Sequence, residues 1–545
     1  MGVAMAKKVL TALRSLLTQR GLDAYLVPRA DHFFGEEVRP CDERLQAVSG
    51  FASSAGLGVV LAQGNSLLLL DSRYSEQAKA ELAGQPWDVI EGGMREIRDR
   101  LVGLQIAYDP WLFSPGQFDG LKELTLVALP TNLVDAVWDD RPPPPQAQAS
   151  YDLPQSLTGE ASLDKRRRLA AACKGRALLI TQPDALAWLM NWRGSDLAYT
   201  PVRLAFGLLW AEGDIEIFAS EDREGLCRAL AQSPSSVPTP IQYDPASTSL
   251  ALVEALGERG QPRPCPIRAA KAVKNATEIA ALRAAHVADG KAVTAFLRWF
   301  EQADKTQLTE LDLADKLADC RAAVPGYAGP SFATISGAGP NGSLPHYRVS
   351  QASNRRLREG DFVVLDSGGQ YPGATTDVTR TLRVGQVSAE RRAHFTLVLK
   401  GMIALTLQQF PVGTTGHQLD VLARAALWNA GLNYPHGTGH GVGAGLSVHE
   451  APPNLSPKNL SARAQTAPGD WALKPGMVFS NEPGYYHPGA YGIRCENLML
   501  VVEQAPGWLR LETLTKVPFD ESLVVWELLT RAEADWLRAY QAQVL

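Results

Sequence analysis

The chain has 545 residues, and its 53 basic and 58 acidic side chains give a formal net charge of -5. That length is too great for one ordinary hydrophobic core and predicts about three to four domains. The nearly balanced charge excludes the general positive field of a protein that binds nucleic acid or an anionic membrane, and it favours a small, locally recognised ligand.

The first predicted element is an amphipathic surface helix over residues 1–20, with leucines at helical spacing from Leu10 to Leu17 and Gly21 after it. It lacks the unbroken apolar stretch and cleavage site of a signal peptide. No segment approaches the roughly 18 to 20 apolar residues of a membrane span. The six cysteines are scattered, which favours neither a disulfide framework nor a zinc ribbon. We therefore expect a cytoplasmic protein.

The next elements predict a first α/β domain that ends at a linker. Residues 58–70 contain two apolar runs around Gly64 and Asn65, as in a β-hairpin, and residues 75–82 have a helical pattern. Four prolines at 142–145 can continue neither a helix nor a central strand. We place the first boundary there, so that the first domain covers residues 1–150.

A second α/β domain follows the linker. Residues 163–173 are expected to form a helix, residues 177–181 a strand, and residues 183–192 a helix that begins with proline. A long helical pattern at 271–300 then follows a proline-rich stretch. We therefore predict domains at 151–270 and 271–545.

The third domain is where we expect the chemistry, because eight of the nine histidines follow residue 270. One motif there misleads: residues 337–342 fit G-x-G-x-x-G, but Ser343 and Pro345 follow in place of an opening helix. We therefore reject a nucleotide-binding loop.

Two pairs of carboxylates stand out in this domain. An apolar run ends at Asp366, and a β-branched run carries Asp377. If the two runs form a hairpin centred on residues 371–372, the two aspartates lie opposite each other and repel unless a cation lies between them. Glu482 and Glu496 repeat this arrangement on a second pair of strands.

His440 lies between the two pairs, in the glycine-rich run 436–443. So many glycines exclude a stable helix and let the backbone approach a site closely. Four carboxylates and one imidazole suit two adjacent divalent cations.

Together these motifs resemble the pita-bread metallopeptidases, and within them the long, three-domain aminopeptidase P group. The likeness is carried by five stretches of the third domain, at 365–381, 436–443, 448–450, 481–486 and 492–497. It extends to shorter motifs at 71–74, 193–196 and 272–275. The resemblance implies two creatinase-like α/β domains followed by a pita-bread α+β catalytic domain.

The same resemblance implies the site residues. It assigns two divalent metal ions, usually manganese with zinc or cobalt as alternatives, to five ligands: Asp366, Asp377, His440, Glu482 and Glu496. It further makes Glu482 the carrier of a proton from the attacking water to the leaving proline nitrogen. Three histidines match positions that face the substrate, namely His346, His436 and His449, and Arg494 braces the metal-binding carboxylates.

The resemblance also implies a reaction, with alternatives that stay open at this point. We expect a metal-dependent aminopeptidase that hydrolyses the Xaa-Pro bond of short peptides with proline at position two. The alternatives are a prolidase restricted to Xaa-Pro dipeptides and a non-catalytic peptide-binding module of the same fold. The intact ligand set argues against the module, and also against metal-free amidinohydrolase chemistry on this fold. A homodimer is expected by analogy alone.

Overall fold

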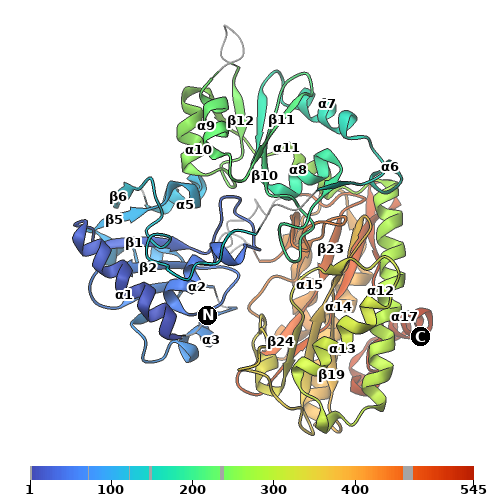
Figure 1. Cartoon of the computed structure of the whole chain (residues 1–545). Helices are drawn as coiled ribbons and strands as arrows, with labels where there is room; N and C mark the ends of the chain where they lie inside the picture. Colours follow the sequence, from blue (N-terminus) through green and yellow to red (C-terminus); the bar gives the residue numbers. More distant parts are fainter. Residues whose placement is uncertain are drawn as a thin grey trace. The chain divides into compact units, whose positions relative to one another are not determined.

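The computed structural model describes residues 3–71, 73–121, 123–145, 150–232, 239–457 and 471–544. Ser72, part of the quoted 71–74 motif, lies outside these ranges. The chain divides into two compact units (Figure 1): residues 1–152, 160–197 and 202–267 form unit 1, and residues 153–159, 198–201 and 268–545 form unit 2. Within the part that the structure describes, no helix is long and apolar enough to cross a membrane.

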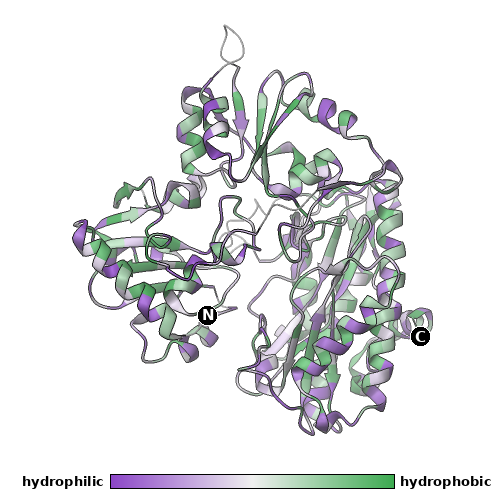
Figure 2. Ribbon diagram, in the orientation of Figure 1, coloured by the Kyte–Doolittle hydropathy of each residue, from purple (hydrophilic) through white to green (hydrophobic). Residues whose placement is uncertain are grey.

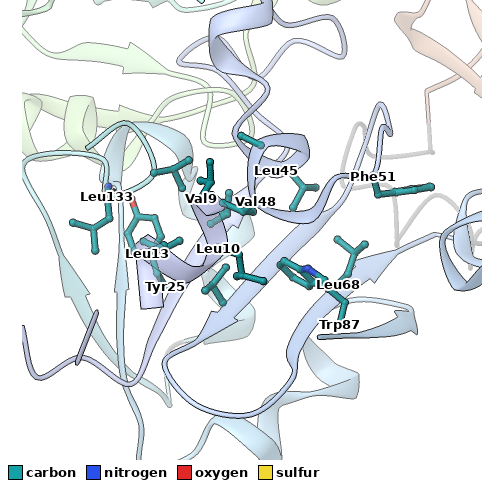
Figure 3. Packing of buried hydrophobic residues seen from close by; sticks show 14 of the residues in the cluster. Val9, Leu10, Leu13, Tyr25, Leu45, Val48, Phe51, Leu68, Trp87 and Leu133 are labelled. Carbon is teal, nitrogen blue, oxygen red and sulfur yellow. Dashed lines mark hydrogen bonds between the residues drawn. The ribbon is translucent and has the colours of Figure 1, made fainter. Parts of the chain in front are cut away.

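Unit 1 begins with helix α1 (Val3–Gln19), which confirms the predicted amphipathic helix. Its Leu10 and Leu13 pack with Tyr25 and Trp87 in a buried core (Figure 3). The predicted hairpin is present as two antiparallel strands, β2 and β3. They belong to a sheet of order β4-β3-β2-β1-β5-β6. Its strands are β1 (Ala24–Pro28), β2 (Leu57–Leu61), β3 (Ser66–Leu70), β4 (Trp87–Glu91), β5 (Gln105–Tyr108) and β6 (Thr125–Ala128).

A second sheet of unit 1 repeats this topology in the order β11-β10-β8-β12-β13. Both sheets contain two antiparallel pairings followed by two parallel ones, and the first sheet has one more parallel pairing, between β3 and β4. The strands are β8 (Ala177–Ile180), β10 (Ala205–Leu209), β11 (Ile215–Ala219), β12 (Ile241–Tyr243) and β13 (Gly260–Pro262). The longer helices are α3 (Ser75–Glu81), α7 (Ser162–Ala172), α8 (Pro183–Met190), α9 (Arg223–Ala231) and α10 (Leu250–Leu256). The repeated α/β pattern expected after the linker is therefore confirmed.

The prediction of one long helix at 271–300 was wrong at the start of this range. The structure has two helices, α11 (Pro266–Ala272) and α12 (Ala276–Gln302). Asn275 separates them, because its side chain accepts hydrogen bonds from the N–H groups of Thr277 and Glu278 and so caps α12. Glu278 returns a bond to the Asn275 N–H and completes a capping box.

Unit 2 is built from small sheets covered by helices. Phe296 of α12 and Leu317 of α13 pack on Val363 of β16, and Leu405 of α14 packs on Phe479 of β23. Figure 2 shows that hydrophobic residues predominate in the strands, whereas α12 and α13 also carry hydrophilic residues. The helices are α13 (Glu310–Ala322), α14 (Ala389–Leu407), α15 (Gly416–Trp428) and α17 (Arg531–Val544).

The sheets of unit 2 have the orders β15-β16-β19, β14-β17-β18 and β20-β27-β26-β23-β21-β22, and β24 pairs with β25. The first two sheets contain β14 (Gly329–Pro330), β15 (Ile335–Ala338), β16 (Phe362–Ser367), β17 (Gly369–Tyr371), β18 (Ala374–Thr375) and β19 (Val378–Arg383). The others contain β20 (Phe410–Pro411), β21 (Gly439–Gly441), β22 (Glu450–Leu455), β23 (Val478–Asn481), β24 (Gly484–His487), β25 (Tyr491–Arg494), β26 (Asn497–Ala505) and β27 (Trp508–Thr513).

Candidate metal centre

Asp366 and Asp377 belong to two antiparallel strands, but the predicted register was wrong by two residues. Asp366 of β16 pairs with Thr379 of β19, and Asp377 directly precedes β19. The turn lies at residues 372–373, because β17 and β18 form a small hairpin there in which Tyr371 pairs with Ala374. Since side chains alternate with a period of two, a shift of two residues leaves both aspartates on the same face of the sheet.

Glu482 and Glu496 flank a second pair of strands. Glu482 follows β23 and Glu496 precedes β26, and the last pair of the ladder between them is Asn481 with Asn497. The chain between the glutamates forms the hairpin β24–β25. The two carboxylates therefore leave neighbouring strands at the same end, but Glu496 lies between β25 and β26 and not within the expected returning strand.

His440 lies on the adjacent strand β21, between two glycines. Gly441 pairs with Phe479 of β23. At Gly439 a Cβ atom would lie 1.7 Å from the carbonyl oxygen of Ser480, so only glycine allows this close approach. The glycine-rich run is thus a short strand that brings His440 beside Glu482.

The side chains of four of these residues converge. Nε2 of His440 lies 3.5 Å from Oδ2 of Asp377 and 3.4 Å from Oε1 of Glu482. Ligand atoms of Asp377, His440 and Glu496 all lie within 4.8 Å of one another. Nδ1 of His440 is 2.9 Å from the Gly441 carbonyl oxygen, which can only accept, so Nδ1 carries the proton and Nε2 is the nitrogen directed at the carboxylates.

The charges of this cluster are not balanced by the protein alone. Burial, with the charges of Asp377 and Glu482, raises the pKa of Asp366 to about 6 despite the nearby Arg494 guanidinium. Burial and the neighbouring acids also raise the pKa of Glu482 and carry that of Glu496 well above its ordinary value. Burial lowers the pKa of His440, but Asp377 and Glu482 outweigh it and raise that pKa to about 9. These shifts show that the buried carboxylates favour the binding of protons or other cations.

The donor set fits divalent cations. Oδ1 of Asp366 and Oδ1 of Asp377 are buried and have no hydrogen-bond partner among the described residues. Buried carboxylate oxygens are normally paired, so these two call for a ligand. Carboxylate oxygens with one imidazole nitrogen suit manganese, zinc or cobalt. The residues present therefore fit a metal centre.

Arg494 connects Asp366 and Glu496 through a chain of hydrogen bonds. It donates through Nη2 to Oδ2 of Asp366 at 2.6 Å and through Nε to Oγ1 of Thr379 at 3.2 Å. Thr379 in turn donates to Oε2 of Glu496 at 2.7 Å. Thr379 was not among the predicted site residues, although its position two after Asp377 places it on the same face of the strand.

Tyr486 is a second residue that the sequence did not assign. Its hydroxyl accepts from Nη1 of Arg494 at 2.6 Å and lies 2.9 Å from Nε2 of His436. Burial raises the pKa of Tyr486 to about 12, so the phenol keeps its proton. Nδ1 of His436 faces the carbonyl oxygen of Gly437 at 2.8 Å and carries a proton, which leaves Nε2 to accept from Tyr486.

The other two predicted histidines lie on loops beside this cluster. The ring of His449 packs edge-on against that of His440, with centroids 4.2 Å apart, and its side chain is exposed. His346 follows Pro345, whose carbonyl oxygen accepts from Nη1 of Arg494 at 3.2 Å. Residues 339–343 form a short 3₁₀ helix. The G-x-G-x-x-G run therefore does not open an α-helix, as expected.

Comparisons with known proteins agree with this geometry. Family models match along the chain: metallopeptidase family M24 at residues 280–503, its C-terminal region at 507–545, and two creatinase/prolidase N-terminal domains at 10–136 and 140–278. The chain is similar to probable Xaa-Pro aminopeptidases P of Neurospora crassa and Laccaria bicolor. Each is 35% identical over 98% of this chain, which covers 85% and 89% of those relatives.

A solved structure is also similar over almost the whole chain. It is an X-prolyl aminopeptidase from Caenorhabditis elegans, described as a cytosolic enzyme with a dinuclear active site. The likeness has a TM-score of 0.91 at 32% identity and covers 99% of this chain and 95% of that one.

Proposed function

The chain belongs to the Xaa-Pro aminopeptidase P family of M24 metallopeptidases, and on that premise we propose that it releases the first residue of peptides whose second residue is proline. As a family member it is a metal-dependent aminopeptidase, with two creatinase-like α/β domains before a pita-bread catalytic domain. The observation that carries the proposal is the convergence of Asp377, His440 and Glu496 within 4.8 Å in a chain that matches this family from end to end.

We assign the two divalent metal ions of this family to Asp366, Asp377, His440, Glu482 and Glu496, and we propose manganese as the metal. When bound, divalent cations lower the pKa of water and polarise a peptide carbonyl. The protein contributes fixed ligands: the Gly441 carbonyl holds the His440 ring, and Thr379 and Arg494 hold Glu496 and Asp366.

The remaining roles belong to groups around the ligands. Glu482 takes the proton of the attacking water and returns it to the proline nitrogen, supported by the Ser480 hydroxyl 3.1 Å from Oε1. His346, His436 and His449 hydrogen-bond the peptide and stabilise the tetrahedral intermediate. His436 can donate to a peptide oxygen only when Nε2 is protonated and the Tyr486 hydroxyl, which lies 2.9 Å from Nε2, has moved aside.

The decisive experiment measures metal content and peptide cleavage on the same preparation. We expect about two manganese ions per chain and release of arginine from Arg-Pro-Pro. A metal-free protein that binds this peptide without cleaving it would instead support the binding module. Faster cleavage of an Xaa-Pro dipeptide than of the matching tripeptide would support the prolidase.

We further propose three domains at 1–150, 151–270 and 271–545, a cytosolic location and a homodimer. The six cysteines are unpaired, which suits the reducing cytosol. The similar enzyme from C. elegans is described as cytosolic. Light scattering during gel filtration tests the dimer, since a mass near 59 kDa would show a monomer.

A further inference from the structure

Glu310, the first residue of α13, is a fully buried carboxylate outside the metal centre. Burial raises its pKa, and hydrogen bonds from four neighbours oppose that shift. A buried carboxylate is tolerated only when its oxygens are satisfied, so the identity of its donors indicates what it holds.

All four donors come from one segment, residues 338–355. Oε1 accepts from the Ala338 N–H at 2.7 Å and from the Asn341 amide at 3.0 Å. Oε2 accepts from the Tyr347 hydroxyl and from the Arg355 N–H, each at 3.0 Å. The backbone N–H of Glu310 also donates to the Arg355 carbonyl oxygen at 3.0 Å. One side chain thus ties together both ends and the middle of this segment.

His346 lies inside the segment that Glu310 organises. It is part of a turn in which the Tyr347 N–H donates to the Leu344 carbonyl oxygen at 3.1 Å. The residue before it is bound by Arg494 through the Pro345 carbonyl oxygen, and the residue after it is bound by Glu310 through the Tyr347 hydroxyl. The residues on either side of His346 are therefore each held by a buried charged side chain, Arg494 or Glu310. Arg494 also donates to Asp366.

The segment is fixed against the strand that carries Arg494 as well. At Gly492 of β25, a Cβ atom would lie 1.8 Å from the Gly342 carbonyl oxygen, so the 3₁₀ helix at 339–343 packs directly on that backbone. Loss of the bonds to Glu310 would therefore leave the segment held near Gly342 and Pro345 but release its bonds at Ala338, Asn341 and Tyr347. The turn at 344–347 would pivot about the Arg494 contact and displace the imidazole.

We infer that Glu310 is a positioning residue for the aminopeptidase reaction, which holds His346 at its place beside the metal centre. This inference rests on the proposed contact of His346 with the peptide. Among the described residues, the hydrogen bonds to the Glu310 carboxylate come from the segment 338–355 and not from the proposed metal ligands, so its effect passes through this segment.

A double-mutant cycle tests whether Glu310 acts through His346. Glu310→Gln keeps the shape but turns an N–H₂ group toward donors, so we expect kcat/KM on Ala-Pro-Ala to fall about 10- to 100-fold. The same substitution in a His346→Ala background should change kcat/KM by less than about twofold, because two residues that act as a unit are not additive.

Two further variants keep the test sharp. Tyr347→Phe removes a single donor and should give a smaller loss, about three- to tenfold, that also vanishes in the His346→Ala background. Asp315→Asn, on an exposed residue of the same helix α13, makes the same charge change and should leave kcat/KM unchanged. Hydrogen exchange should rise in peptides from 338–355 of the Glu310→Gln protein, while its manganese content stays that of the wild type.

The outcomes separate this inference from the function on which it rests. An equal loss for Glu310→Gln in the wild-type and His346→Ala backgrounds would overturn the positioning role alone. Wild-type kcat/KM in His346→Ala would overturn the role of His346 and this inference with it. Loss of manganese in Glu310→Gln or Tyr347→Phe would also overturn it, because the residue would then act on the metal centre.

Discussion

Arg494 donates through Nη2 to Oδ2 of Asp366 at 2.6 Å, and both side chains are almost fully buried. The guanidinium lowers the pKa of Asp366 against the effect of burial and of two neighbouring acids. Arg494 thereby keeps this carboxylate available for the metal ions that we propose at this site.

Replacing Arg494 should therefore weaken metal binding. In Arg494→Met the pKa of Asp366 rises further, so a cation has to displace a proton. We expect manganese affinity to fall about 10- to 100-fold, measured by titration with detection of free Mn²⁺ by electron paramagnetic resonance. Arg510→Met removes an exposed arginine of β27 and should have no effect. Unchanged affinity in Arg494→Met would show that Asp366 needs no support.

Ligands and substrate-facing groups should separate in mutagenesis. Asp377→Asn and His440→Ala should lose metal and activity together, and prolonged chelation of the wild type should abolish activity until manganese is returned. His436→Ala should keep its metal and lose turnover by on the order of 100-fold, because a donor to developing charge is removed. Elemental analysis and kcat on each protein provide the check. Equal metal loss in all three variants would mean that the ligand set is drawn wrongly.

The residue pattern brought the proposed metal ligands together, but it gave the pairing of their strands incorrectly. Order and residue type identify Asp366 and Asp377, but the register was wrong because the small hairpin β17–β18 shifts the turn by one residue. The error did not change the face on which the aspartates lie, since the shift between the strands is even. The two aspartates were therefore expected on the correct face, although the pairing of their strands was predicted incorrectly.

Contacts between distant segments were outside the reach of the sequence. Tyr486 lies in a quoted motif, but its bond to His436 joins residues 50 positions apart. Glu310 is separated from Tyr347 by 37 positions, and nothing in local patterning distinguishes it from an exposed acid at a helix start. The spacing of apolar residues also predicted one helix across Asn275. The capping bonds that divide it are made by the Asn275 side chain and do not alter that spacing.

Stability should depend on pH through a buried ion pair that supports β17. Asp289 of α12 accepts from Arg321 of α13 at 2.7 Å and from the Tyr371 hydroxyl at 2.8 Å. Burial raises the pKa of Asp289, but the Arg321 charge and these hydrogen bonds outweigh it and hold the pKa below that of an ordinary aspartate. An acid whose folded pKa is depressed stabilises the fold above its unfolded pKa and loses that contribution as the pH falls through the folded value.

Asp289→Asn should therefore lower the free energy of unfolding by about 3 to 5 kcal/mol at pH 7, because it leaves Arg321 buried without its counter-charge. The difference from the wild type should shrink below about pH 4. Urea unfolding of metal-free protein at pH 7 and pH 3 measures both effects without a contribution from metal release. A difference that is the same at both pH values would contradict the ion-pair account.

Proline at position two should be strongly preferred over alanine. The Xaa-Pro bond is a tertiary amide without an N–H group, so a site shaped for it can present an apolar wall there. An alanine N–H against that wall loses its hydrogen bond at about 1 to 3 kcal/mol, or about 5- to 150-fold in kcat/KM. Ala-Pro-Ala and Ala-Ala-Ala, compared by release of free alanine, test this preference, and equal rates would contradict it.

Peptide length should decide between the aminopeptidase and the dipeptide-restricted alternative. An aminopeptidase P must leave room beyond proline, whereas a prolidase must bind the proline carboxylate with a cation. If the site is open beyond proline, it places no cation beside the proline carboxylate, so Ala-Pro has to bring that charge into the site without a partner. Ala-Pro-Ala places the carboxylate one residue further away and should be cleaved faster at equal concentration. Ala-Pro-NH₂ removes the charge at constant length, so it should recover part of the difference. If Ala-Pro is instead the better substrate and amidation slows its cleavage, the protein recognises the proline carboxylate and is a prolidase.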